Sequence, residues 1–579
     1  MENIINKHEN FAIPLSEYPR PQLERESFFC LNGVWDFEVA NIGCNDFEFT
    51  KKITVPFSPE TKASGVEMQI FPTDIMHYKR SFTLTDDFIK DRVFLHFGGV
   101  DYSCEVFVNG VSVGTNQGGY IPFSFDITEV CKNENQLYLK VWDPTDQGWG
   151  ARGKQVLKPS TIWYTPNSGI YQTVWIESTN KTFLSELTIN QDFDNKIVTF
   201  LFDVDDYSSG ELKIKHGENI VASKKLKGEK SIDIKIHNAL CWSPESPTLY
   251  DVEIQLEKDV VKSYFGFRKF STEIAKDGKL RLFLNNKPYL HNGLLDQGYW
   301  QESLLTPPSE EAMIFDIQKT KELGFNMLRK HIKIEPLRWY YHCDKIGMLV
   351  WQDFVSGGDS KYKPMITMVL PFIGVKVSDK RYSLFSRKSK DSRDEFEKDA
   401  VATVNLLKNV TSISTWTIFN EGWGQFDSAR ITDKIREIDK TRHIDSTSGW
   451  HDTNSGDFAS SHIYFRKVKL KKDKRVIALS EFGGYSMAVK GHYGNDKPYG
   501  YKMYKDKEKL ENDVVELYKK EVIPHIEMGL SAIVYTQVSD VEGECNGIYT
   551  YDRKVLKFSA EKLQDSNKKL FDKFEEITT

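Results

Sequence analysis

Apolar and polar residues alternate along the first third of the chain with the two-residue period of β-strands. In "CEVFVNGVSVG" two alternating runs flank Asn109 and Gly110, a dipeptide typical of tight hairpin turns. "NQLYLKVWD" (135–143) and "GIYQTVWIE" (169–177) continue the pattern between polar and glycine-rich turns. Short strands without amphipathic helices predict a β-sandwich over residues 1–181.

The alternation continues through residues 182–275. "KIVTFLFDV", "ELKIKHG" and "SIDIKIHN" are followed by "CWSPESPTLYDVEIQLE", in which Pro244 and Pro247 precede another alternating strand. The length and the pattern predict a second, smaller sandwich of immunoglobulin-like type.

From residue 276 to 579 strands alternate with helices. "TPPSEEAMIFDIQKTKELG" predicts a helix that begins near Ser309 and ends before Gly324, and "EPLRWYYHCDKIG" predicts a second one between Pro336 and Gly347. "FNMLR", "MLVWQD" and "SISTWTIFNE" predict strands. The alternation fits a (β/α)₈ barrel, which takes roughly 250 residues. It also fits a doubly wound sheet, but no G-x-G-x-x-G turn follows a strand, which disfavours the nucleotide-binding version.

Composition excludes several classes of function. A net charge of −6 argues against nucleic acid as the main partner. The seven cysteines are scattered and never spaced C-x-x-C, which is typical of reduced thiols rather than of a disulfide framework or a zinc site. We see no signal peptide and no run of 18 apolar residues, so we expect a cytoplasmic protein that does not associate with membranes. The basic, serine-rich segment 376–396 predicts a solvated loop, with a mobile lid as the alternative.

Two glutamates follow apolar runs where barrel strands would end. Because the carboxyl ends of barrel strands share one cup, Glu421 after "TWTIFN" and Glu481 after "VIALS" would meet there. Glycoside hydrolysis needs such a pair, with one carboxyl protonated and the other ionised. Arg329 would keep Glu481 ionised, and Asn420 would donate a hydrogen bond to a sugar 2-OH. The glycines that follow each glutamate would leave room for a substrate.

Other strand ends supply further candidates for substrate binding. The polar candidates are either hydroxyl-binding or supporting groups, and the aromatic candidates are either sugar platforms or packing residues. Besides Asn420 and Arg329, the set consists of His331, Asp296, Asp353, Trp300 and Trp423. His462 has no carboxylate or histidine partner at a short fixed spacing, so we expect it to be a donor behind the site rather than a metal ligand. No clustered His/Asp set is recognisable, which disfavours metal-assisted hydrolysis.

With these residues the chain resembles glycoside hydrolase family 2, the family of β-galactosidases, β-glucuronidases and β-mannosidases. "WTIFNEGWG" is similar to the acid/base motif of the family, "VIALSEFGG" to its nucleophile motif, and "LGFNMLRKHIKIEP" to its Gly-Phe-Asn, Arg and His pattern. The resemblance covers nearly the whole chain, and it implies that the sandwich of residues 1–181 is the sugar-binding jelly-roll domain of the family. It implies that Glu421 is the general acid/base, Glu481 the nucleophile, and Asn420 the 2-OH partner in a retaining mechanism. It also implies that Tyr464, in "SSHIYF", donates a hydrogen bond to the nucleophile.

Departures from the family pattern guide the substrate prediction. Familiar β-glucuronidases carry an Asn-x-Lys pair after the eighth strand, whereas this chain has Glu544, Cys545 and Asn546 there, and a glutamate would repel a uronate. The metal-ligand environment of the large β-galactosidases is not recognisable, so we expect no metal and no cofactor. We predict an exo-β-glycosidase acting on a neutral hexoside or an oligosaccharide, with a galactoside first, and a homodimer formed through the β domains. The alternatives are β-mannosidase, β-glucuronidase or arabinosidase specificity, or an inactive carbohydrate-binding relative.

Overall fold

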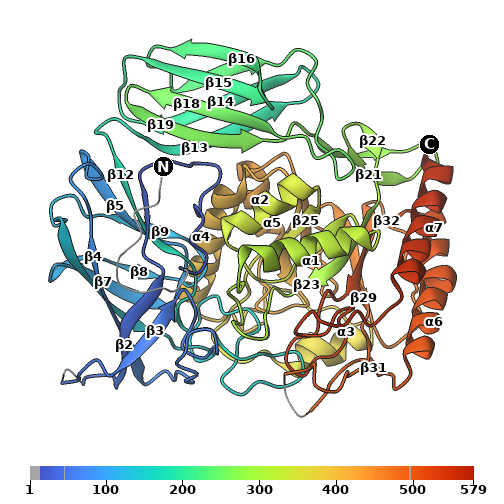
Figure 1. Ribbon diagram of the computed structural model, residues 1–579. Helices are drawn as coiled ribbons and strands as arrows, with labels where there is room; N and C mark the ends of the chain where they lie inside the picture. The colour runs from blue at the N-terminus through green and yellow to red at the C-terminus, as the bar shows by residue number, and fades with distance from the viewer. Residues whose placement is uncertain (1–12, 45, 495–496) are drawn as a thin grey trace.

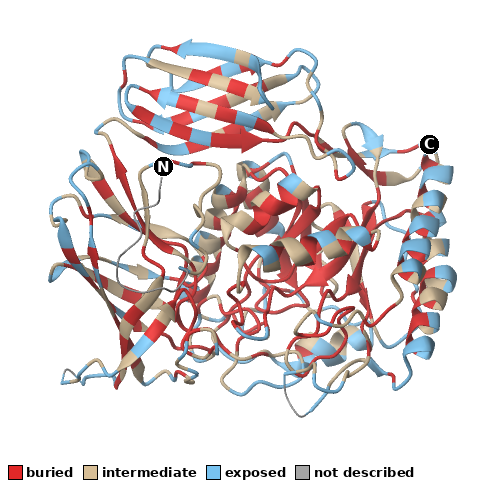
Figure 2. Ribbon diagram, in the orientation of Figure 1, coloured by how far each residue is buried: buried red, intermediate tan, exposed pale blue. Residues whose placement is uncertain are grey.

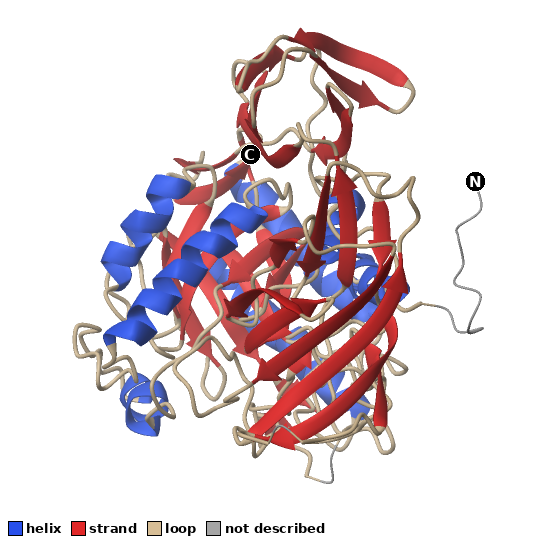
Figure 3. Ribbon diagram, turned by 90° about the vertical axis from the view of Figure 1, so that its left-hand side faces the viewer, coloured by secondary structure: helices blue, strands red, loops and turns tan. Residues whose placement is uncertain are grey.

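The computed structural model describes residues 13–44, 46–494 and 497–579. Three parts follow one another along the chain: a large β-sandwich, a smaller β-sandwich, and a barrel of strands and helices (Figure 1). Figure 3, seen from the side of the large sandwich, shows its strands in front of the barrel helices and the small sandwich above them. The three-part fold predicted from the sequence is confirmed.

The large sandwich pairs a six-stranded sheet, in the order β3-β2-β4-β10-β7-β8, with a four-stranded sheet, β1-β12-β5-β9. The strands of the first sheet are β2 (Gly33–Asn41), β3 (Lys51–Val55), β4 (Asp74–Thr83), β7 (Ser103–Val108), β8 (Val111–Gln117) and β10 (Glu134–Trp142). Those of the second are β1 (Phe28–Cys30), β5 (Arg92–Phe97), β9 (Phe123–Asp126) and β12 (Val174–Thr179), and β6 (Val100–Asp101) pairs with β11 (Gly169–Ile170). The predicted hairpin is confirmed, because Val108 pairs with Val111 around Asn109 and Gly110, both of which have positive φ.

The small sandwich packs a three-stranded sheet, β13-β14-β17, against a four-stranded sheet, β16-β15-β18-β19. Its strands are β13 (Leu184–Asp192), β14 (Ile197–Val204), β15 (Gly210–His216), β16 (Asn219–Leu226), β17 (Ser231–Lys235), β18 (Tyr250–Leu256) and β19 (Asp259–Phe265). Alternate residues of β14 and β18 are buried, which is the period-two pattern of the sequence. A small sheet of β20 (Phe270–Ile274), β21 (Leu280–Leu284) and β22 (Lys287–Pro288) leads into the barrel.

The barrel is an eight-stranded parallel sheet in the order β27-β26-β25-β24-β23-β32-β29-β28, and β27 lies against β28, so the sheet closes. Its strands are β23 (His291–Asp296), β24 (Met327–Lys330), β25 (Leu349–Asp353), β26 (Ile413–Asn420), β27 (His443–Ser448), β28 (Phe458–Ile463), β29 (Val476–Gly483) and β32 (Leu530–Thr536). Figure 2 shows these strands almost wholly buried, whereas the outer faces of the helices are exposed. The strands are therefore covered by helices outside and filled by side chains inside.

The two barrel helices with start and stop signals in the sequence, α1 (Glu310–Glu322) and α2 (Leu337–Ile346), begin and end where those signals predict. The other longer helices are α4 (Lys390–Leu407), α5 (Ser428–Ile438), α6 (Lys507–Leu517) and α7 (Ala560–Thr578). Shorter elements are the π-helix η1 (Met365–Val369), α3 (Leu370–Phe372), β30 (Tyr485–Ser486), β31 (Lys502–Met503), the π-helix η2 (Tyr518–Val522) and the 3₁₀-helix η3 (Ile523–Met528). Ser309 caps α1 by accepting a hydrogen bond from Ala312 N, and Gly347 ends α2 with φ +82°.

One loop prediction is wrong at its end. The segment 376–396 was expected to be a solvated loop, but from Lys390 onward it forms the start of α4, with Ser389 as its N-cap. Arg387 in the same segment is buried rather than solvated, and its guanidinium donates to the carbonyl oxygen of Gly424 at 2.9 Å. Arg387 therefore braces the chain that follows Glu421.

Candidate active site

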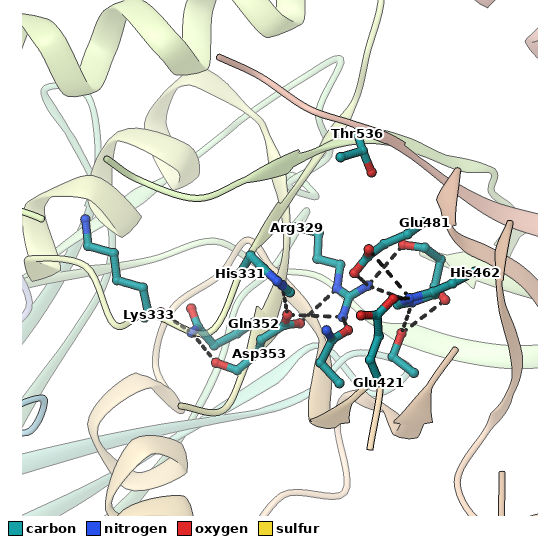
Figure 4. A network of polar contacts seen from close by, with 12 residues as sticks. Arg329, His331, Lys333, Gln352, Asp353, Glu421, His462, Glu481 and Thr536 are labelled. Atoms are coloured by element: carbon teal, nitrogen blue, oxygen red, sulfur yellow. Dashed lines mark hydrogen bonds and ion pairs between the residues drawn. The ribbon is translucent and has the colours of Figure 1, made fainter. Parts of the chain in front are cut away.

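The two glutamates lie side by side at the carboxyl ends of barrel strands (Figure 4). Glu421 follows directly on β26, and Glu481 lies near the end of β29. One carboxylate oxygen of Glu421 lies within 4.8 Å of one of Glu481, and the residues are only 7% and 4% exposed. Glu421 adopts the left-handed backbone region at φ +50°, which costs a non-glycine residue about 1–2 kcal/mol. The turn after β26 thus holds a carboxyl group at the top of the barrel in a strained conformation.

Arg329, at the end of β24, joins the site residues into one network. Its guanidinium donates to both carboxylate oxygens of Asp353, at 3.0 and 3.1 Å. It also donates to Glu481 Oε1 at 3.0 Å and to Asn420 Oδ1 at 2.8 Å. The side chain is fully buried, so these charge-assisted hydrogen bonds operate at a low local dielectric.

The network holds Glu481 in the ionised form. Burial by itself would raise the pKa of its carboxyl, but the positive fields of His462 and Arg329 and the hydrogen bond from Tyr464 outweigh burial and lower the pKa below 4.5. The Tyr464 hydroxyl donates to Glu481 Oε2 and also lies 2.9 Å from Thr536 Oγ1. Glu481 is therefore a carboxylate at neutral pH.

Glu421 is shifted in the opposite direction. Burial raises the pKa of its carboxyl above 4.5, and the negative charge of Glu481 raises it further, against the lowering effect of a hydrogen bond with His462. His462, at the end of β28, places Nδ1 2.8 Å from Glu421 Oε1 and 3.5 Å from Glu481 Oε2. The two carboxyl groups therefore have pKa values displaced in opposite directions, which is the pattern of an acid and base pair.

His462 has no partner at a short spacing along the chain, but the fold brings two distant carboxylates to it. The ligand-type atoms of Glu421, His462 and Glu481 lie within 4.8 Å of one another, and this is the spacing at which three side chains can share a metal ion. One histidine nitrogen with carboxylate oxygens is a donor set that Zn²⁺ accepts. Sequence reasoning missed the cluster because its members lie on three strands, and the only available signal was a polar residue near the end of another apolar strand.

Only the oxygen of the Asn420 side-chain amide is hydrogen-bonded within the described residues. Its Oδ1 accepts the hydrogen bond from Arg329, which fixes the orientation of the amide. Its Nδ2 is buried and finds no hydrogen-bond acceptor among the described residues. A buried amide donor without a partner is uncommon, and it is satisfied when a ligand supplies an acceptor.

Asp353 and His331 belong to the network, whereas Asp296 and Trp300 have other contacts. The carboxylate of Asp353 is hydrogen-bonded to Arg329 and to His331, whose Nδ1 lies 2.7 Å from Asp353 Oδ2. Asp296 instead accepts from Lys330 Nζ at 2.7 Å. The ring of Trp300 lies under the guanidinium of Arg553 at 4.1 Å. Asp353 therefore supports the site from behind, and the contacts of Asp296 and Trp300 lie outside it.

Trp423 stands beside the site in a group of aromatic rings. Its ring centroid lies 6.1 Å from that of His331, 6.2 Å from that of Tyr362 and 5.2 Å from that of Trp163. Trp163 comes from the large sandwich, between β10 and β11, so that domain reaches the top of the barrel. No sequence signal linked it to the site.

The glycines after the two glutamates make room for the protein itself rather than for a substrate. A Cβ atom on Gly424 would lie 2.2 Å from the carbonyl oxygen of Gly357, and one on Gly484 would lie 2.5 Å from the ring of Tyr501. Both glycines also have positive φ, which disfavours other residues. The expectation that these glycines leave space for a sugar is not supported by these contacts.

Models of known protein families match three consecutive parts of the chain. A model described as "Glycosyl hydrolase 2 galactose-binding domain-like" matches residues 45–177, "Glycosyl hydrolases family 2" matches residues 173–268, and "Glycosyl hydrolases family 2, TIM barrel domain" matches residues 276–554. No helix in the described ranges is long and apolar enough to cross a membrane.

Similar sequences include a β-galactosidase of Thermoanaerobacter pseudethanolicus, 29% identical over 49% of this chain and 40% of the relative. A β-galactosidase of Streptococcus thermophilus is 26% identical over 63% of this chain and 35% of the relative, and a putative β-glucuronidase of Formosa agariphila is 26% identical over 49% and 28%. The chain thus spans less than half the length of these relatives.

Solved structures share the fold at low sequence identity. A β-D-glucuronidase from Dictyoglomus thermophilum superposes with a TM-score of 0.74 at 19% identity, over 95% of this chain and 98% of that one. A β-galacturonidase from Eisenbergiella tayi, bound to galacturonate, superposes with a TM-score of 0.69 at 19% identity, over 96% and 98%. Because models of one family match the three consecutive domains and these folds agree, the chain belongs to glycoside hydrolase family 2.

Proposed function

We propose that this protein is a retaining exo-β-glycosidase in which Glu421 is the general acid/base and Glu481 the nucleophile. The observation that carries the proposal is the buried pair itself: two carboxyl groups within 4.8 Å of one another whose pKa values are displaced in opposite directions. Retaining glycosidases hold their carboxyl groups about 5–5.5 Å apart, whereas inverting enzymes need about 6.5–9.5 Å to admit a water molecule.

The chemistry follows from the two protonation states. The ionised Glu481 attacks the anomeric carbon and forms a glycosyl ester, while the protonated Glu421 transfers its proton to the oxygen of the leaving group as the glycosidic bond breaks. Glu421, now a carboxylate, then removes a proton from water, which attacks the anomeric carbon and releases Glu481. Two inversions give net retention of the anomeric configuration.

Asn420 and Tyr464 assist this sequence. The free Nδ2 of Asn420 is oriented by Arg329 and would donate to the sugar 2-OH, a contact that strengthens as positive charge develops at the neighbouring anomeric carbon. Tyr464 donates to Glu481 Oε2 and would keep that carboxylate aligned for attack.

A neutral sugar, with a β-galactoside first, is the substrate class we favour. The support is that relatives named β-galactosidase match at 26–29% identity, and that Glu544 is buried and its charge acts on Lys154 together with those of Glu481 and Glu421, so it would repel a carboxylate bound among them. Uronides are the rival, because the solved neighbours include a β-glucuronidase and a β-galacturonidase.

The roles are tested by varying the leaving group. On p-nitrophenyl glycosides of galactose, glucose, mannose, glucuronic acid and arabinopyranose, one sugar should be turned over, and Glu481→Gln should abolish this turnover. Glu421→Ala should lose several orders of magnitude on a glycoside with an alkyl leaving group but far less on a dinitrophenyl glycoside, whose leaving group needs no proton. If Glu421→Ala lowered turnover equally for both leaving groups, Glu421 would not be the general acid. A folded protein that binds a sugar without turnover would be an inactive relative.

A further inference from the structure

One buried lysine makes neither an ion pair nor a hydrogen bond within the described ranges. Among the described residues four lysines are buried, and three of them, Lys330, Lys333 and Lys557, make ion pairs with carboxylates at 2.6–2.8 Å. Lys154 is 5% exposed, and its ammonium makes no ion pair and no hydrogen bond with any residue of the described ranges. Burying an unpaired ammonium is costly, and burial indeed lowers the pKa of Lys154.

The ammonium of Lys154 lies at the top of the barrel beside the catalytic pair. Its Nζ is 5.7 Å from the ring centroid of Trp423 and 5.4 Å from that of Tyr164. The negative charges of Glu544, Glu481 and Glu421 act on it, with Glu544 the strongest. Lys154 therefore faces the site, although it belongs to the large sandwich.

The segment between β10 and β11 that carries Lys154 is firmly docked on the barrel. The N–H groups of Arg152 and Gly153 both donate to the carbonyl oxygen of Ser356 at 2.9 Å. The carbonyl oxygen of Lys154 accepts from Tyr164 N at 3.0 Å. Gly153 has φ +58°, and a Cβ atom there would lie 3.0 Å from a carbonyl oxygen of the barrel. The ammonium is thus placed by a rigid backbone.

Glu544 is the natural counterpart of this ammonium. It is 1% exposed, its Oε2 accepts a hydrogen bond from the Tyr164 hydroxyl, and its Oε1 accepts one from Asn546 Nδ2 at 2.8 Å. A carboxylate offers about four lone-pair sites, so acceptor capacity remains. The Tyr164 side chain touches both groups, since its ring lies near the ammonium of Lys154 and its hydroxyl binds the carboxylate. The two charges nevertheless make no ion pair with each other.

We propose that Lys154 and Glu544 form a recognition pair for hydroxyl groups of a neutral sugar in the proposed glycosidase reaction, and the inference rests on that function. The ammonium would donate a hydrogen bond to a hydroxyl oxygen, and the carboxylate would accept a hydrogen bond from the same hydroxyl group or from the adjacent one. Only a group that both donates and accepts satisfies the two charges together. A uronate carboxylate would satisfy Lys154 but would face the negative charge of Glu544 in a buried site.

The test compares Lys154→Met and Glu544→Gln with Lys158→Met, an exposed lysine of the same segment. Hydrogen bonds to charged groups contribute about 1.5–3 kcal/mol, so each of the first two variants should lose roughly 10- to 150-fold in kcat/KM on the neutral p-nitrophenyl glycoside. Lys158→Met should be unchanged. On deoxy analogues that lack the bound hydroxyl, Lys154→Met should cause little further loss, because the contact is already absent.

Two readouts separate recognition from a structural role. Lys154→Met should leave the thermal midpoint unchanged or raised, because the ammonium has no ion pair or hydrogen bond to lose, whereas Lys557→Met should lower it. Binding of the neutral monosaccharide to Glu481→Gln, followed by calorimetry, should weaken about 10-fold or more when Lys154→Met is added. This binding test does not need turnover, so it stands if the proposed hydrolysis fails.

Three results would overturn the proposal. The first is a wild-type preference for a uronide that Lys154→Met removes selectively, which would make Lys154 a carboxylate receptor. The second is an equal loss on every glycoside, including the deoxy analogues. The third is unchanged monosaccharide binding by the Lys154→Met protein. Turnover that survives in Glu481→Gln would instead refute the proposed function and leave the binding result to decide the recognition pair.

Discussion

Tyr464→Phe removes one donor from Glu481 and leaves the aromatic ring in place. In the folded protein the hydroxyl donates to Glu481 Oε2 inside a buried network. A hydrogen bond to a charged group contributes about 1.5–3 kcal/mol, and 1.36 kcal/mol corresponds to one pKa unit. The pKa of Glu481 should therefore rise by about 1–2 units in the variant.

The sign of the effect on activity follows from the role of each glutamate. Glu481 must be ionised to attack, so kcat/KM rises as the pH passes the lower pKa of the pair, which lies below 4.5 in the wild type. Glu421 must be protonated, so kcat/KM falls as the pH passes the upper pKa, which lies above 4.5. In Tyr464→Phe the acid limb should move about 1–2 pH units upward and the basic limb far less, which narrows the profile.

The assay is kcat/KM against pH on the best glycoside of the panel, with Tyr485→Phe as the matched control. The ring of Tyr485 packs against that of Tyr504. Loss of the Tyr485 hydroxyl therefore takes no hydrogen-bond donor away from Glu421 or Glu481. An acid limb that stays in place in Tyr464→Phe, or a shift of equal size in Tyr485→Phe, would refute the reasoning about Glu481.

Three further predictions concern the frame of the site. Arg329→Met should lower the free energy of unfolding by about 3–5 kcal/mol in urea melts, because it leaves buried carboxylates unpaired, and Asp353→Asn on top of it should restore part of the loss. Gly424→Ala should lower the thermal midpoint sharply, since its Cβ would lie 2.2 Å from a carbonyl oxygen, whereas Gly43→Ala, also at positive φ but with open space around it, should cost only about 1–2 kcal/mol. Dialysis against EDTA should leave turnover unchanged, and a loss that Zn²⁺ restores would show that the buried Glu-His-Glu cluster binds metal.

Local rules were enough to predict the elements. The hairpin at Asn109 depends on the φ preferences of two residues, and the ends of α1 and α2 depend on caps within a few residues of each helix. The positions of Glu421 and Glu481 were predictable for a related reason. Each follows an apolar run, and the strand ends of a closed parallel barrel point to one side whatever the side chains around them.

The sequence by itself determined the three-part fold and the pairing of the two glutamates, because periodicity, caps and strand ends act over short stretches of chain. Only the tertiary structure decided which other groups surround that pair. Asp296 binds Lys330, and His462 contacts Glu421 from another strand. Tyr164 donates a hydrogen bond to Glu544, which lies 380 positions away in the sequence. The first two contacts depend on how barrel strands lie beside one another, and the third depends on how the large sandwich docks on the barrel. Both arrangements arise from the summed packing of surfaces that no local pattern records.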